Sequence, residues 1–119
     1  MREVIRDTKG IPLEKFLDQV GAAIRTQLPG TYWVRAEILN CTKKNYWSIE
    51  LSSYDNESQK AKIRANIWAS NSNIVTQFES QTGAMLKPGL KILFACSVQF
   101  HAEFGISLNI TEIDPSFTL

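Results

Sequence analysis

Two short stretches decide the fold of this chain: Tyr46-Trp47-Ser48-Ile49-Glu50-Leu51 and Lys62-Ile63-Arg64-Ala65-Asn66-Ile67-Trp68. Apolar and polar residues alternate in both, with the period of two that is typical of a strand with one buried face. We expect the odd-numbered residues of 47–51 and 63–67 to point into a core. The even-numbered residues then form an exposed face with Tyr46, Ser48, Lys62, Arg64, Asn66 and Trp68. Such a face combines cations with flat rings, which is the chemistry that binds phosphates and stacks unpaired bases.

Composition limits the possible classes of protein. The chain has 119 residues, of which 44% are hydrophobic, so it is long enough for one compact domain with its own core. The net charge of +1 does not by itself indicate a polyanionic partner, so any binding of nucleic acid must depend on local clusters of Lys and Arg. No stretch approaches the roughly 20 apolar residues of a membrane span. The first residues lack the features of a signal peptide, and we expect a cytoplasmic protein without membrane contact.

The remaining segments predict further helices and strands around the two quoted stretches. Residues 1–10 show no periodicity and are expected to be a flexible lead-in. An apolar stripe at steps of three and four residues predicts a helix over 12–28, which ends at Leu28-Pro29-Gly30. Alternation predicts a strand over 31–39, and the polar composition of 40–45 and 52–61 predicts loops.

The second half of the chain predicts one more helix and two more strands. Apolar spacing favours a short helix over 71–81, with Asn and Ser residues as N-caps. A turn at Lys87-Pro88-Gly89 then precedes a long strand over 90–100. A tip at 101–105 leads into the last strand over 106–113.

This order of elements predicts a mainly β fold with flanking helices. A helix, three strands, a helix and two strands match the five-stranded barrel that binds oligonucleotides and oligosaccharides, the OB fold. A small SH3-like barrel would usually lack the helix between the third and fourth strands. An open α+β sheet is the remaining alternative.

Several segments resemble those of a known family. They are Trp33-Val34-Arg35-Ala36-Glu37-Ile38-Leu39-Asn40, Asn45-Tyr46-Trp47-Ser48-Ile49-Glu50-Leu51, Ala61-Lys62-Ile63-Arg64-Ala65-Asn66-Ile67-Trp68 and Ile113-Asp114-Pro115. In this order they are similar to the W-V-x-G-E-I-S-N, G-H-W-Y-F-S-L and A-x-I-R-x-x-x-F strands and the closing M-E-P of the exodeoxyribonuclease VII large subunit. Pro88-Gly89 lies where that family has a glycine turn, and Phe117-Thr118-Leu119 resembles the start of its Y-T-L-G linker.

The resemblance implies a domain organisation and a function. Residues 11–115 would be the N-terminal OB domain of such a subunit, including the leading helix, and residues 116–119 would begin the linker to a nuclease core outside this chain. Members of the family degrade single-stranded DNA into oligonucleotides and assemble with small subunits. The implied partners are therefore single-stranded DNA, the nuclease core of the same polypeptide and the small subunits of an exonuclease complex.

The candidate DNA-binding residues divide into rings and polar or charged side chains. Tyr46 and Trp68 are the candidates for base stacking, and Phe104 lies beside His101 at the predicted tip. Lys62, Arg64 and Asn66 share the exposed face, and Lys43 and Lys44 lie in the first inter-strand loop, which OB domains use for contacts. Structural alternatives stay open for several of them. Trp68 could pack beneath a helix, and Lys62 and Arg64 could pair with Glu50 on a solvated face.

No catalytic constellation is visible in the sequence. Asp55 and Glu57 lack a third carboxylate at metal-binding spacing, and no glycine-rich phosphate loop is present. Cys41, Cys96 and the single His101 are too few for a structural zinc site, and the two cysteines are expected to be free thiols. We therefore expect neither catalysis nor a cofactor from this chain. The rival interpretation is an OB module whose Tyr46/Trp68 face docks a partner subunit or the parent's own core, whereas a stand-alone hydrolase has no supporting residues.

Overall fold

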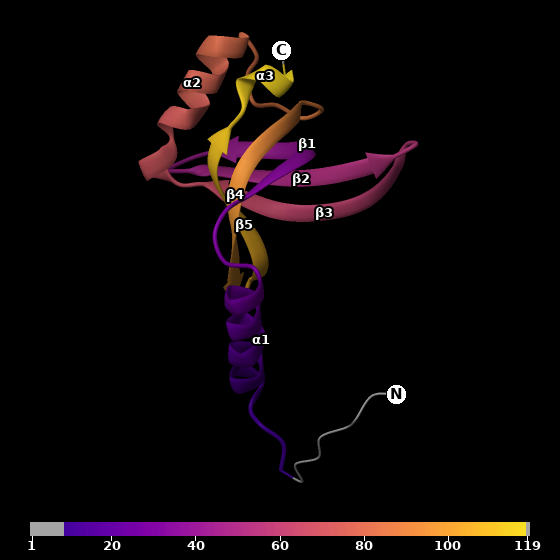
Figure 1. The fold of residues 1–119 in the computed structure, drawn as a ribbon, viewed down its shortest axis with the longest axis vertical. Coiled ribbons are helices and arrows are strands. Elements are labelled where there is room, and N and C mark those ends of the chain that lie inside the picture. Colours follow the sequence, from indigo (N-terminus) through magenta and orange to yellow (C-terminus); the bar gives the residue numbers. More distant parts are fainter. Residues whose placement is uncertain (1–8, 119) are drawn as a thin grey trace.

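Five strands close into a barrel in the computed structural model, which describes residues 9–118. The strands are β1 (Tyr32–Lys43), β2 (Trp47–Asp55), β3 (Ser58–Ile67), β4 (Lys91–His101) and β5 (Gly105–Ile113). Their order around the barrel is β1-β2-β3-β5-β4, in which only the β3–β5 pair is parallel (Figure 1). The predicted mainly β OB fold is confirmed. The predicted lead-in at 1–10 lies outside the described residues, apart from its last two positions.

Two helices occupy the predicted places. The leading helix α1 (Leu13–Gln27) begins and ends one residue inside the predicted 12–28, because Pro12 is its N-cap and Leu28 its C-cap. The second helix, α2 (Asn73–Thr82), follows a short 3-10 turn, η1 (Ala69–Asn71), between β3 and β4. No helix in the described part of the chain is long and apolar enough to cross a membrane.

The core confirms the predicted phase of the two quoted strands. Ile49, Leu51, Ala65 and Ile67 are at most 1% exposed, whereas Trp47 and Ile63 are half-buried. The other strands and α2 complete this core with Ile38, Val75, Phe78, Ile92, Phe94, Cys96 and Ile110. Because side chains on a strand alternate between its two faces, burial of the odd-numbered residues leaves the even-numbered ones of these segments on the outer surface.

The prediction of a loop over 52–61 is wrong. β2 continues to Asp55 and β3 begins at Ser58, so only Asn56 and Glu57 form the connection. Both have a positive φ, 50° and 71°, as a tight type I′ hairpin turn requires. The hairpin extends beyond the barrel as an arm with two solvated faces, which explains its polar composition (Figure 1).

The polar connection predicted over 40–45 is also too long. β1 continues to Lys43, and its register with β2 shifts between Ile38 and Asn40. This irregularity lets the strand bend and continue past the end of its apolar alternation. Lys43 therefore lies at the end of a strand and not in a loop, and only Lys44 and its neighbours form the turn.

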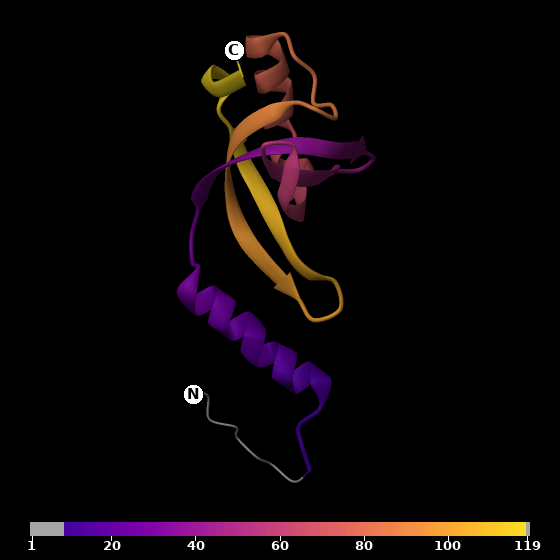
Figure 2. The same ribbon diagram turned by 90° about the vertical axis from the view of Figure 1, so that its right-hand side faces the viewer.

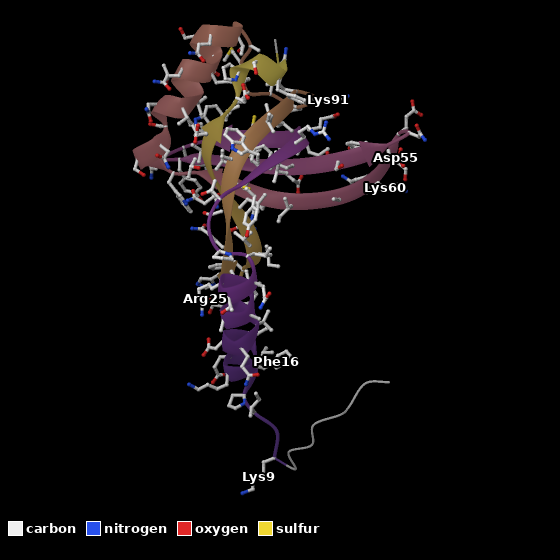
Figure 3. The ribbon with its side chains drawn as sticks, in the orientation of Figure 1. Lys9, Phe16, Arg25, Asp55, Lys60 and Lys91 are labelled. Atoms are coloured by element: carbon white, nitrogen blue, oxygen red, sulfur yellow. The ribbon has the colours of Figure 1, made fainter. Side chains whose placement is uncertain are left out.

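Helix α1 leaves the barrel at the tip of the β4–β5 hairpin and points away from the rest of the molecule (Figures 1 and 2). Gly21 is its buried residue, and a Cβ atom at this position would lie 3.0 Å from Cδ2 of Phe100 on β4. The helix rests on the hairpin through this side. Its first turns extend past the tip, where Leu13 and Phe16 remain 69% and 52% exposed (Figure 3).

The described chain ends in a short helix, α3 (Pro115–Thr118), that is fixed to the barrel. Asp114 precedes it, and the backbone N–H and the hydroxyl of Ser116 both donate to Asp114 Oδ1, at 2.9 and 2.7 Å. The hydroxyl of Thr118 donates to the carbonyl oxygen of Lys91 at 3.2 Å. Residues 116–118 of the expected linker thus form a capped helical turn against β4, whereas Leu119 lies outside the described residues. The boundary with a following domain stays a prediction.

Candidate nucleic-acid interface

A groove of about 620 Å³ lies between the β2–β3 surface and the β4–β5 hairpin. Ser48, Arg64 and Asn66 from β2 and β3 line one side of it, with Tyr46 and Trp68 just beyond the strand ends. The hairpin lines the other side through Gln99, Phe100, His101, Phe104, Gly105 and Ser107. Five of the eight residues predicted from the sequence either line this groove or lie at its rim: Tyr46, Arg64, Asn66, Trp68 and Phe104.

Strand register explains why these residues meet. Ser48 pairs with Asn66 across the antiparallel β2–β3 ladder, and directly paired residues project from the same face. Arg64 pairs with Ser107 in the parallel β3–β5 ladder, which closes the barrel. This closure brings the β4–β5 hairpin beside the outer face of β3, so the groove depends on contacts between segments far apart in the sequence.

The rings of Tyr46 and Trp68 form the aromatic side of the groove. Their centroids are 4.8 Å apart and their planes are tilted by 44°. They are 39% and 37% exposed, so Trp68 is not packed beneath a helix. Rings that contact each other and remain open to solvent can stack on the face of an unpaired base.

A second pair of rings lies on the β4–β5 hairpin. His101 and Phe104 stack with centroids 4.6 Å apart and an interplanar angle of 26°. The backbone N–H of Glu103 donates to His101 Nδ1 at 3.0 Å, so this nitrogen is an acceptor and Nε2 carries the proton of the neutral ring. This hydrogen bond holds the imidazole in place against Phe104 at the mouth of the groove.

Arg64 joins the two sides of the groove. Its Nη2 donates to the carbonyl oxygen of Phe104 at 3.1 Å, while the side chain as a whole stays exposed. Within residues 9–118 no Asp or Glu side chain lines the groove, and Arg64 is its only Lys or Arg. Its guanidinium has further N–H groups that can contact a phosphate.

The three predicted lysines lie outside the groove lining. Lys62 Nζ is 3.5 Å from Glu50 Oε2, which is the surface ion pair that the sequence left open as an alternative. Lys43 pairs with Trp47 in the β1–β2 ladder, and its Nζ lies 5.9 Å from the centroid of that ring. Lys44 is exposed in the turn, where its N–H donates to the carbonyl oxygen of Tyr46.

Sequence reasoning named the tip of the β4–β5 hairpin through Phe104 and His101 but missed the strand residues of that hairpin that line the groove. Gln99, Phe100 and Ser107 were not anticipated as lining residues. A local signal existed for one of them, because Ser107 and Asn109 alternate with Ile106, Leu108 and Ile110 in the last strand. That alternation identifies an outer face but does not show which strand it will lie beside.

Asp55, Cys41 and Cys96 lie outside the groove lining. None of the groups of His, Cys, Asp and Glu between residues 9 and 118 could hold a metal ion. Asp55 lies at the distal end of the arm (Figure 3). Cys41 and Cys96 are free thiols, and burial raises the pKa of both, which keeps them protonated.

Comparisons with known proteins agree with this geometry. Residues 11–114 match the family model described as the OB-fold nucleic acid binding domain. The chain is also 34% identical over 116 residues to the exodeoxyribonuclease 7 large subunit of Deinococcus radiodurans. This alignment covers 92% of the chain but only 28% of that subunit, so the chain spans little more than a quarter of its relative. The resemblance seen in the sequence motifs is confirmed.

Proposed function

The chain belongs to the family of OB-fold nucleic-acid-binding domains and is related to exodeoxyribonuclease VII large subunits, and from this premise we propose that its groove binds single-stranded DNA. The observation that carries the proposal is the pair of aromatic platforms on the two sides of one groove. Tyr46 and Trp68 occupy one side, and His101 and Phe104 the other. Only unpaired bases expose both of their faces for stacking on such rings, so a single strand fits better than a duplex.

The positions of the cations support particular phosphate contacts. Arg64 lies between the two aromatic platforms and would contact a phosphate inside the groove. Lys44, in the turn beside Tyr46, would contact a phosphate of the DNA strand next to the Tyr46 and Trp68 rings. Lys43 and Lys62 lie farther out and would add weaker, solvent-screened attraction, since Lys62 already pairs with Glu50. Each neutralised phosphate lowers log K by about 0.7 per log unit of salt for a single strand.

The proposed role in the parent protein is presentation of the strand. We infer that the domain holds single-stranded DNA and directs it to a nuclease core encoded farther along the same polypeptide, in a complex that includes small subunits. The relation to an exodeoxyribonuclease large subunit supports this role.

A titration with labelled oligonucleotides tests the proposal. Fluorescence anisotropy should show binding to a mixed-sequence single strand, weakening as salt rises, with much weaker binding to the matching duplex. The fluorescence of Trp68 should change on binding because its ring contacts bases. Equal affinity for duplex and single strand, or no change in tryptophan fluorescence at saturation, would contradict stacking in the groove. An unchanged tryptophan fluorescence would favour the interpretation that this face docks a protein.

A further inference from the structure

A second cavity opens where the β2–β3 arm diverges from the barrel. Apolar side chains from all five strands line it: Val34, Ala36, Leu51, Ala61, Ile63, Phe94 and Leu108. Four polar or charged residues also line it: Ser52, which is buried, and the exposed Arg35, Ser53 and Lys62. We refer to this cavity as the apolar cleft. It shares no lining residue with the groove.

The size of the apolar cleft suits a single side chain. Its volume is about 260 Å³, which is below the roughly 300–1,000 Å³ of pockets that enclose drug-sized ligands. Its lining is mostly aliphatic, and the one ring, Phe94, is fully buried and presents no face for stacking. The apolar side chains of this lining offer a nucleobase no hydrogen-bonding partner in exchange for water. An aliphatic or aromatic side chain loses no hydrogen bond to water.

A basic surface adjoins the apolar cleft. The neighbouring cavity, of about 360 Å³, shares Arg35, Ala36, Ser52 and Ser53 with the cleft and adds Glu37, Tyr54, Lys91 and Phe117. We call this neighbouring cavity the basic shelf. Figure 3 shows Lys91 on the side of the barrel from which the arm extends. Within residues 9–118 neither Arg35 nor Lys91 forms an ion pair, although Lys91 lies opposite Glu37 in the β1–β4 ladder.

We propose that the apolar cleft and the basic shelf together bind an acidic protein segment that carries one large apolar side chain. The apolar side chain enters the cleft, and the carboxylates that flank it contact Arg35 and Lys91. Charge complementarity favours this occupant, since the shelf holds two unpaired cations beside the single carboxylate of Glu37. Tyr54 and Phe117, both exposed, flank the shelf and would cover the backbone of the segment.

This surface is independent of the groove, so the domain could hold a DNA strand and an acidic protein segment at the same time. The inference therefore does not depend on the proposed function. It assigns a second role to the β2–β3 hairpin, which contributes Leu51, Ala61 and Ile63 to the lining of the cleft.

A synthetic peptide provides the probe. A fluorescein-labelled peptide of Asp, Glu and Ser residues with one central Phe should bind the full chain, and the same peptide with Ser in place of Phe should bind about tenfold more weakly or not at all. The variant Ala61→Leu fills the cleft from the exposed arm and should weaken binding of the Phe peptide about tenfold. The double variant Arg35→Glu/Lys91→Glu should have a similar effect. Ala22→Leu, on an exposed face of α1, is the matched control and should bind the peptide as tightly as the unsubstituted chain does.

Each outcome decides for or against the acidic segment. Thermal unfolding of every variant verifies that it is folded. The groove variant Trp68→Ala should bind the peptide as tightly as the unsubstituted chain does. Equal binding of the Phe and Ser peptides, or no loss on filling the cleft, would overturn the inference. Displacement of the peptide by a single-stranded oligonucleotide would also overturn it and reassign the cleft to nucleic acid. Loss of DNA binding in Trp68→Ala with peptide binding retained would show that the two surfaces act separately.

Discussion

The rings of Tyr46 and Trp68 lie 4.8 Å apart although the whole β2–β3 hairpin separates them in the sequence. Trp47 and Ile67, their neighbours in the chain, are paired residues at the end of the β2–β3 ladder. The hairpin register therefore places the two rings side by side just beyond its last pair. The register at the platform depends on both the two-residue turn at the far end of the arm and the register shift between Ser53 and Tyr54, so the aromatic platform depends on the whole hairpin.

Removal of one ring tests the platform directly. Trp68→Ala should weaken binding of a single-stranded oligonucleotide by about 1–3 kcal/mol, the usual contribution of one stacked base. Trp33→Ala removes another exposed tryptophan, on β1 and outside the groove lining, and should leave the affinity unchanged. Anisotropy titrations of both variants at one salt concentration provide the comparison. Equal losses for the two variants would mean that the groove is not where bases stack.

Two neighbouring cations should behave differently. Arg64 lines the groove, whereas Lys62 pairs with Glu50 outside it. Arg64→Gln should lower the slope of log K against log salt by about 0.7, which corresponds to one phosphate contact. Lys62→Gln should change the slope by less. Titrations at several salt concentrations measure both slopes, and a larger effect of Lys62 than of Arg64 would place the DNA backbone along the arm.

The sequence predicted the phase of the strands but not the extent of the arm. Burial of Ile49, Leu51, Ala65 and Ile67 follows from local alternation, which needs no knowledge of distant contacts. The arm has two solvated faces, so its residues lack the alternation that marks a strand. Its polar composition therefore predicted a loop. The pairing of Lys62 with Glu50 was left as one alternative because register across a hairpin depends on the turn.

The second side of the groove could not be derived from local patterns. It exists because β3 and β5 pair in parallel and close the barrel, which brings Phe104 within hydrogen-bonding distance of Arg64. The sequence named Phe104 and Arg64 as candidates for separate reasons, a loop tip and a strand face. Gln99 and Phe100 were missed since nothing in their own segment shows which surface they will oppose.

The turn of the arm offers a stabilising substitution. Glu57 has a φ of 71°, a conformation that costs a residue with a side chain about 1 kcal/mol and costs glycine little. Glu57→Gly creates the Asn-Gly sequence preferred in type I′ turns and should raise the melting temperature. Gln59→Gly, at a position that pairs with Tyr54 in the arm, is the control and should lower it, because glycine weakens a strand. A lower melting temperature for Glu57→Gly would contradict this account of the turn.

The cap of α3 should make stability depend on pH. The hydroxyl and the N–H of Ser116 donate to the carboxylate of Asp114 and lower its pKa below the ordinary value. A lowered folded-state pKa means that the stabilisation is complete above the ordinary pKa of an aspartate and is lost as the pH falls through the folded-state value. Asp114→Asn should retain the cap, since Asn is equally good at this position, but should lose that pH dependence. Thermal unfolding of both proteins from neutral to acidic pH measures the difference, and parallel curves would contradict the role of the carboxylate.

Helix α1 packs on the β4–β5 hairpin through the contact between Gly21 and Phe100, and this contact leaves little room for a side chain. A Cβ at Gly21 would lie 3.0 Å from the ring of Phe100, which is the close limit of real contacts, so a larger side chain forces the helix away from β4. Gly21→Leu should lower the free energy of unfolding by about 1–3 kcal/mol through overpacking, although leucine is the better helix former. Once released, a helix of 15 residues is marginal in water, so α1 should also become sensitive to protease.

A matched substitution on the next residue separates packing from helix propensity. Ala22→Leu lies on an exposed face of the same helix and should leave both the melting temperature and the protease resistance of α1 unchanged. Phe100 also lines the groove, so displacement of its ring by Gly21→Leu should weaken binding of single-stranded DNA, whereas Ala22→Leu should not. If Gly21→Leu altered neither stability nor DNA affinity, α1 would not rest on Phe100 in solution. A loss of stability without a loss of affinity would instead confine the role of this contact to anchoring the helix.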